Sequence, residues 1–231
     1  AVIAVGDCER AWLEEQIRAV FGALPAAADS RPRPAFPVPE HRETLFAIAT
    51  DPEATATRVT VYVKSPARDQ STVGAYRRHL ARLLYERMLN QRLYELSMLA
   101  EPPFLSAASG TSLLVATAQA QVLSCQVAEG KAATGLEAML REARRVQVHG
   151  FLPAELDRAG REMLRAVEQA YRERDRREST YYAAEYVRHF LQSEPSPGIE
   201  YELGLYRTFL PQITLADVAA AAAPWNGEAN R

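Results

Sequence analysis

Residues 75–96, AYRRHLARLLYERMLNQRLYEL, combine a histidine and two glutamates with a long apolar pattern. Two of these residues, His79 and Glu86, have the side chains of metal ligands or of an acid–base pair. A zinc peptidase places two ligands one helical turn apart beside a glutamate that activates water, as in His-Glu-x-x-His or His-x-x-Glu-His. Neither motif occurs, and the spacing of His79 and Glu86 puts them about 10 Å apart along a helix. We therefore expect no zinc site on this helix.

The other side chains capable of chemistry match no familiar active site. The remaining histidines, His41, His149 and His189, have no histidine partner one turn away. Cys125 lies in an apolar segment, where a thiol is more often a packing group than a nucleophile. The sequence has neither a Gly-x-Ser-x-Gly elbow nor a glycine-rich phosphate loop. From the residues alone we expect no catalytic and no metal-binding residue, while the substrate-binding residues stay open.

Composition narrows the class of protein. The 231 residues are 48% hydrophobic and have a net charge of −2, which suits a globular core and argues against a dedicated nucleic-acid surface. The two cysteines allow one disulfide, but two cysteines far apart in a chain of this size are more often reduced. No apolar run is long enough to span a bilayer, so we expect no membrane span.

Hydrophobic periodicity predicts the elements that hold these residues. Strands are expected at 1–6, 44–51 and 56–66, and two or three more within 105–130. The expected helices are 8–24, about 70–99, 131–148, 153–177, 179–192, 198–210 and 214–223. The order of strands followed by helices predicts an α+β domain, with an antiparallel sheet and helices packed on one face. In the helix around 70–99, an apolar stripe is predicted to face the core; it consists of Leu80, Leu83, Leu84, Met88 and Leu93.

A proline-rich segment divides the chain. Five of the fourteen prolines lie in residues 25–43, which predicts a semi-stiff linker. Residues 1–24 are then expected to be the last strand and helix of a preceding domain, and residues 44–231 the main domain. Because the chain opens on an apolar strand without an initiator methionine, we expect it to be a piece of a longer protein.

The order of several short motifs resembles the pitrilysin/insulinase family of zinc metallopeptidases. The opening AVIAVGDCERAWLEEQIRAVFGAL resembles the end of a family domain, with a strand closing in Gly-Asp, a helix and Phe-Gly-x-Leu. GFLPAELDRAGREMLRAVEQAYRERDRRES resembles the family's helix pair, and FLQSEPSPGIEYELGLYRTFLPQITLADV its late segment. The final WNGEANR resembles the turn before a domain's last strand, so the resemblance implies that the last strand of 44–231 is missing.

The resemblance also shows where this chain departs from the family's functional residues. If His79 aligns with the first zinc ligand, the motif reads His79-Leu80-Ala81-Arg82-Leu83, with arginine in place of the general base and leucine in place of the second ligand. Some partner domains of the family supply an Arg and a Tyr seven residues apart that bind substrate. Here Ser97 and Phe104 stand at those positions, and neither can act as a cation or a phenolic donor.

The resemblance implies a role for the chain within a larger protein. It implies the end of a catalytic domain, a linker and a non-catalytic, inactive second domain of a bacterial metalloendopeptidase that degrades peptides, a domain that shapes its chamber. Zinc would belong to the parent's catalytic domain, and the partners would be the other domains of the same polypeptide and a peptide substrate. The alternative is a fragment of a catalytically dead member that acts as an assembly scaffold. The compartment stays open between periplasm and cytoplasm.

Overall fold

The computed structural model describes residues 1–25, 32, 34–68, 70–227 and 229–231. Its sheet has three antiparallel strands in the order β1-β3-β2, with bounds β1 (Thr57–Pro66), β2 (Ser106–Val115) and β3 (Ala118–Val127). The alternation of Val59, Val61 and Val63 with polar residues places these valines against the core. The central strand β3 is the most buried, because it has a neighbour on each side.

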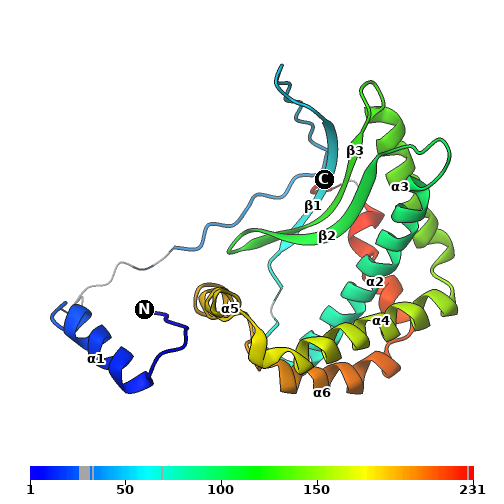
Figure 1. Ribbon diagram of the computed structural model, residues 1–231. Helices are drawn as coiled ribbons and strands as arrows, with labels where there is room; N and C mark the ends of the chain where they lie inside the picture. Colours follow the sequence, from blue (N-terminus) through cyan, green and yellow to red (C-terminus); the bar gives the residue numbers. More distant parts are fainter. Residues whose placement is uncertain (26–31, 33, 69, 228) are drawn as a thin grey trace.

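Two helices cover one face of this sheet. The long helix α2 (Val73–Ser97) packs across β2, and α3 (Ala132–His149) packs across β3 and β1 (Figure 1). Helix α2 begins at Thr72, whose hydroxyl accepts a hydrogen bond from the amide of Ala75 at 3.1 Å. Helix α3 approaches β3 closely at Gly135, where a Cβ atom would lie 2.4 Å from a methyl group of Val127.

A second layer of helices packs on α2. It begins with α4 (Pro153–Arg172), whose first turn is capped because Glu155 accepts a hydrogen bond from the amide of Leu152. The remaining elements are η1 (Arg174–Arg176), α5 (Ser179–Gln192), α6 (Ile199–Phe209), η2 (Leu210–Gln212), α7 (Leu215–Ala220) and η3 (Ala223–Asn226). Helices α4, α6 and α7 contact α2 (Figure 1). The predicted α+β class, with its helices on one face of an antiparallel sheet, is confirmed.

The core lies between α2, α3 and the covered face of the sheet. The predicted stripe on α2 is buried or packed against this core, with Leu80, Leu84 and Leu93 fully buried and Leu83 partly so. Phe104 and Leu123 fill the space toward the sheet. The stripe prediction is therefore confirmed.

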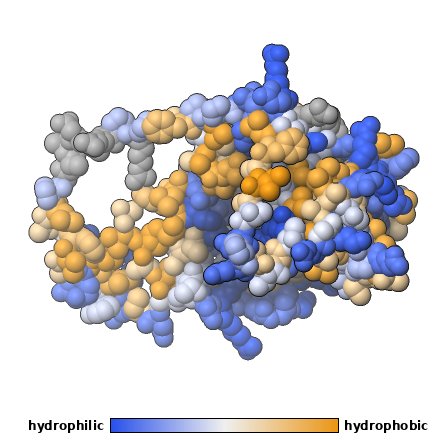
Figure 2. Space-filling view, turned by 90° about the horizontal axis from the view of Figure 1, so that it is seen from above, coloured by the Kyte–Doolittle hydropathy of each residue, from blue (hydrophilic) through white to orange (hydrophobic). Residues whose placement is uncertain are grey.

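The N-terminal part of the chain stands apart from this core. Helix α1 (Arg10–Phe21) has no buried residue, and Trp12 and Phe21 are 56% and 46% exposed. Apolar surface gathers over this part of the molecule, on the left of the space-filling view (Figure 2). The strand predicted at 1–6 does not form, because a strand requires a partner for its backbone groups and residues 1–6 pair with no other strand.

Two other sequence expectations meet the structure between α1 and β1. Of the predicted linker 25–43, residues 26–31 and 33 lie outside the described residues, and 34–43 contain neither helix nor strand. The strand predicted at 44–51 is wrong for this chain: residues 44–50 join no strand ladder. Among the described residues, no helix is long and apolar enough to cross a membrane.

Candidate functional site on the long helix

A polar stripe on α2 faces β2. It consists of Arg82, Glu86 and Asn90, which are spaced four residues apart and therefore share one side of the helix. The Asn90 amide group donates to the carbonyl of Ser109 at 2.9 Å and accepts from its amide at 2.6 Å. The hydroxyl of Thr111 donates to Glu86 Oε1 at 2.6 Å. Through these hydrogen bonds, Glu86 and Asn90 hold α2 against β2.

Arg82 connects this stripe to His79. Its guanidinium is buried, and its Nη2 lies 2.6 Å from His79 Nδ1. Its Nε lies 3.7 Å from Glu86 Oε1, a distance that allows charge attraction but is too long for a hydrogen bond, and within the described part of the chain Nε has no hydrogen-bond partner. Burial, together with the charge of Arg68, lowers the pKa of Arg82, and Glu86 opposes this shift.

His79 is held as a neutral acceptor. Burial, followed by the charge of Arg82, lowers the pKa of His79 to about 4. Because Arg82 can only donate, the ring accepts at Nδ1 and carries its proton on Nε2. Arg82 therefore lies between His79 and Glu86. His79 accepts a hydrogen bond from Arg82, and Glu86 accepts one from Thr111. Among the described residues, no group of three or more His, Cys, Asp or Glu side chains is arranged to hold a metal ion.

Ser97 and Phe104 stand where the family resemblance places a substrate-binding pair, and both are engaged within the fold. The Ser97 hydroxyl donates to the carbonyl of Tyr94 at 2.7 Å, at the end of α2. Phe104 is 2% exposed and belongs to the core. Phe104 therefore offers no surface to a peptide, and Ser97 completes the last turn of its own helix.

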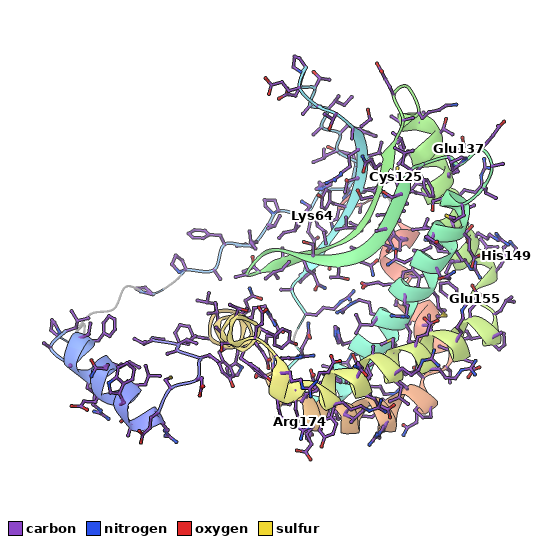
Figure 3. The ribbon with its side chains drawn as sticks, viewed as in Figure 1. Lys64, Cys125, Glu137, His149, Glu155 and Arg174 are labelled. Atoms are coloured by element: carbon purple, nitrogen blue, oxygen red, sulfur yellow. The ribbon has the colours of Figure 1, made fainter. Side chains whose placement is uncertain are left out.

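The remaining candidates lie apart. Cys125 is buried on β3 (Figure 3), and burial raises the pKa of its thiol, whereas Cys8 is exposed; both are free. The Nδ1 atoms of His41 and His189 lie 2.6 Å and 2.7 Å from backbone carbonyls of nearby residues. His149 ends α3 on the surface. The structure does not bring these groups together into a reactive cluster.

Comparison with known proteins shows the family to which a fold of this kind belongs. A match to the family described as the peptidase M16 inactive domain extends over residues 1–163. The chain belongs to this family. It is 34% identical over 220 residues to a protein of Arabidopsis thaliana named zinc protease PQQL-like. That alignment covers 95% of the chain but only 20% of the relative.

Solved structures share the fold of this M16 inactive domain. The first half of the periplasmic protease PqqL from Escherichia coli superposes with a TM-score of 0.86 at 18% identity, over 97% of this chain and 48% of that one. A peptidase M16 inactive domain from Pseudomonas fluorescens has a TM-score of 0.63 at 16% identity, over 94% and 48%. The chain is thus similar to about half of each structure.

One feature of the M16 inactive domain escaped the sequence reasoning. Arg92 of α2 makes two hydrogen bonds to Glu155 of α4, at 2.7 and 2.8 Å, and one to Glu142 of α3 at 3.2 Å. It also donates to the carbonyl of Gly150 and lies 4.8 Å from the centre of the Phe151 ring. Glu155 is visible at the start of α4 (Figure 3). The sequence signal for Arg92 was a charged residue directly before Leu93, which lies on the predicted core stripe. Its partners could not be predicted, because they lie on two helices far away along the chain.

Proposed function

We propose that this domain is a non-catalytic structural part of a zinc-dependent metalloendopeptidase and forms one wall of the chamber in which peptides are cut. The observation that carries the proposal is a sheet whose two faces differ in chemistry. Helices α2 and α3 cover one face, and no described helix packs on the other (Figure 1). A sheet with one solvated face suits a wall that borders an aqueous space.

The uncovered face carries mainly small and polar side chains. Because directly paired residues share a face, Arg58 lies beside Gln126 and Thr60 beside Ser124. The hydroxyls of Thr60 and Ser124 lie 2.9 Å apart. On β2 this face continues with Ser106, Ala108, Gly110 and Ser112. Such a surface leaves room for an extended peptide and presents hydrogen-bonding groups to it.

The exposed apolar side of α1 supports a bracing role. Trp12 and Phe21 are largely uncovered in this chain, and a helix that exposes aromatic residues is stabilised by packing against another surface. We propose that residues 1–24 belong to the preceding, catalytic domain and pack there. The linker then ties that domain to the sheet, since Lys64 donates to the carbonyl of Pro39 at 3.0 Å.

Catalysis in this proposal belongs to another domain of the same polypeptide. The zinc would be held there by a His-x-x-Glu-His motif, which residues 1–231 lack. In this chain Arg82 and Leu83 occupy the positions that would follow His79 in such a motif. The buried Arg82 would place a positive charge where a metal ion would have to bind, which disfavours the ion.

Metal analysis and peptide cleavage test the proposal. The 231-residue chain is expected to bind no stoichiometric zinc and to cleave no fluorogenic peptide, while the full-length protein does both and loses activity to a chelator. One zinc per 231-residue chain together with chelator-sensitive cleavage would overturn it. A full-length protein that lacks both zinc and cleavage would instead support the assembly scaffold.

A pair of matched variants tests the chamber wall itself. In the full-length protein, Ala108→Trp places a large ring on the uncovered sheet face, and Ala166→Trp places the same ring on the exposed side of α4. Only the first is expected to slow peptide cleavage, with zinc content unchanged for both. Equal activity of the two variants would contradict a chamber wall at this face.

A further inference from the structure

We propose that Arg82 and Arg68 form a binding site for a single carboxylate group, with His79 and Glu86 orienting the guanidinium of Arg82. We refer to Arg82 and Arg68 as the carboxylate site. Arg82 lies within the stretch that the family resemblance compares with a metal site, but its charge favours a ligand of the opposite sign. The inference concerns a ligand of this chain and is independent of whether the parent protein cleaves peptides.

Arg82 is a buried cation whose hydrogen-bond donors are largely unused. The residue is 7% exposed, and a guanidinium carries several N–H donors and no acceptor. Within the described residues, Nη2 meets His79 Nδ1 at 2.6 Å, whereas the buried Nε meets no acceptor. Buried polar groups of native proteins are nearly always hydrogen-bonded. The unpaired Nε therefore indicates an acceptor that these residues do not supply.

The charges around Arg82 are not balanced. Glu86 is the one carboxylate within 4.0 Å of it in the described part of the chain, and its Oε1 already accepts a hydrogen bond from Thr111. Arg68 adds a second positive charge, and burial, followed by this charge, lowers the pKa of Arg82. His79 is neutral, since its pKa is about 4. Two positive charges thus face one negative charge, and a buried charge without a counterion is costly.

A carboxylate fits this environment better than water or a phosphate. A water molecule could accept a hydrogen bond from Nε, but it would leave the excess positive charge in place. A phosphate group carries about two negative charges, so it would exceed the excess charge and be repelled by Glu86. A carboxylate carries one negative charge and two oxygens, which match neighbouring N–H groups of a guanidinium.

The carboxylate site lies toward the hairpin end of the sheet. The hydrogen bonds between α2 and β2 show that the two elements run antiparallel, so Arg82 lies one turn closer to the β2–β3 hairpin than Glu86 does. The chain after β1 starts from the same end, because the amide of Ala67 donates to the carbonyl of Thr117 at 3.0 Å, and it then leads to α2 (Figure 1). Arg68 follows directly and is exposed. The site therefore extends from the surface inward to Arg82.

NMR of the Arg82 side chain tests the site in the wild-type 231-residue chain. The probe is N-acetyl-tetraalanine with a free C-terminal carboxylate, and the control is the same peptide with a C-terminal amide, both added at constant ionic strength. The acid is expected to shift the Nε–H resonance of Arg82, because this donor gains an acceptor. The resonance of Arg165, exposed on α4, is expected to stay unchanged. The amide is expected to shift neither resonance.

Three variants provide a second, independent readout of peptide binding. Arg68→Gln removes an exposed charge and is expected to weaken binding of the acid about fivefold. Arg82→Gln removes the buried donors and is expected to weaken it by about tenfold or more. Arg165→Gln removes the same charge from α4 and is expected to bind like wild type. Circular dichroism checks the fold of each variant, and if Arg82→Gln does not fold, Arg68→Gln and the wild-type resonance still decide the question.

Acetate as a third probe distinguishes the source of the carboxylate. Acetate that binds as tightly as the peptide acid would identify a small free carboxylate, whereas tighter binding of the peptide acid would identify the end of a peptide; either result supports the site. An Nε–H resonance of Arg82 that neither probe moves would overturn the proposal. Equal binding of the acid by wild type and Arg68→Gln would overturn it as well.

Discussion

Replacing Arg92 by alanine is expected to be among the most damaging single changes at a charged residue. Its side chain is 15% exposed, and its partners Glu142 and Glu155 are 7% and 15% exposed. The change removes four hydrogen bonds and leaves two carboxylates near the core without their cation. Breaking a buried pair by removing one partner typically costs 3–5 kcal/mol, roughly, because the remaining charge stays buried.

The structure places the cost of Arg92→Ala near the lower end of that range. Glu142 keeps a contact with Arg145 at 3.6 Å, and Glu155 keeps a hydrogen bond from the amide of Leu152 at 2.6 Å. These residual contacts offset part of the loss, so we expect a decrease of about 3 kcal/mol in the free energy of unfolding. The Phe151 ring also loses the guanidinium that lies above it.

Urea unfolding monitored by circular dichroism measures this effect. The matched control is Arg87→Ala, which breaks an ion pair with Glu162 between α2 and α4. In this pair the side chains are 45% and 37% exposed. Exposed pairs contribute about 0–1 kcal/mol, so the control is expected to be nearly silent. If Arg92→Ala costs no more than Arg87→Ala, the three-helix network does not stabilise the fold and the reasoning is refuted.

The pH dependence of stability in wild type and Arg92→Ala gives a further check. The hydrogen bonds from Arg92 hold the pKa of Glu155 below its usual value. A carboxyl with a depressed pKa stabilises the fold above its unfolded pKa of about 4.3, and this stability is lost as the pH falls through the folded value. The difference between wild type and Arg92→Ala is therefore expected to shrink as the pH is lowered from 7 toward 3.

Three further predictions follow from the buried residues. Leu84→Ala should lower the free energy of unfolding by about 2–5 kcal/mol because Leu84 is fully buried, whereas Leu99→Ala at a 54% exposed site should have little effect in the same urea assay. The pKa of His79 is about 4 in the fold against an ordinary 6.5, so the unfolded chain binds more protons between these pH values and stability falls as the pH drops from 6.5 toward 4. His79→Gln should therefore show a flatter dependence of the free energy of unfolding on pH from pH 7 to 4.5. An unchanged slope would contradict a buried, neutral His79. Cys8 should react rapidly with a thiol reagent and Cys125 only after unfolding, because Cys125 is 2% exposed and burial raises its pKa; two equally fast thiols in the native protein would argue against the buried position.

Local patterns predicted the elements that satisfy their own hydrogen bonds. Helix α2 was expected at about 70–99 and runs from Val73 to Ser97, and its apolar stripe lies in the core. A helix bonds within one segment, so periodicity and a cap such as Thr72 are enough to locate it. The antiparallel strands of 105–130 were also expected, because β2 and β3 are neighbours in the chain and pair across a short turn.

The failures occur where a segment depends on a distant partner. Residues 1–6 and 44–51 have the composition of strands, but neither segment pairs with a strand among the described residues. Composition reports the tendency to be extended, and only a second strand at the correct edge turns that tendency into a sheet. At the candidate site, the amino-acid sequence already showed that no zinc motif is present. It could not show that His79 accepts a hydrogen bond from Arg82.

The sequence by itself thus determined the α+β class, the helices, the core stripe and the missing peptidase motif, because each of these depends on residues close together along the chain. Tertiary structure alone decided which polar groups meet. Arg92 joins Glu142 and Glu155 from two other helices, and Arg82 separates His79 from Glu86. The same holds for residues 230–231, which lie between Leu45 and Lys64 only because the fold returns the end of the chain to the open edge of β1. Contacts across such separations depend on how packed elements are placed in space, which no local pattern of residues encodes.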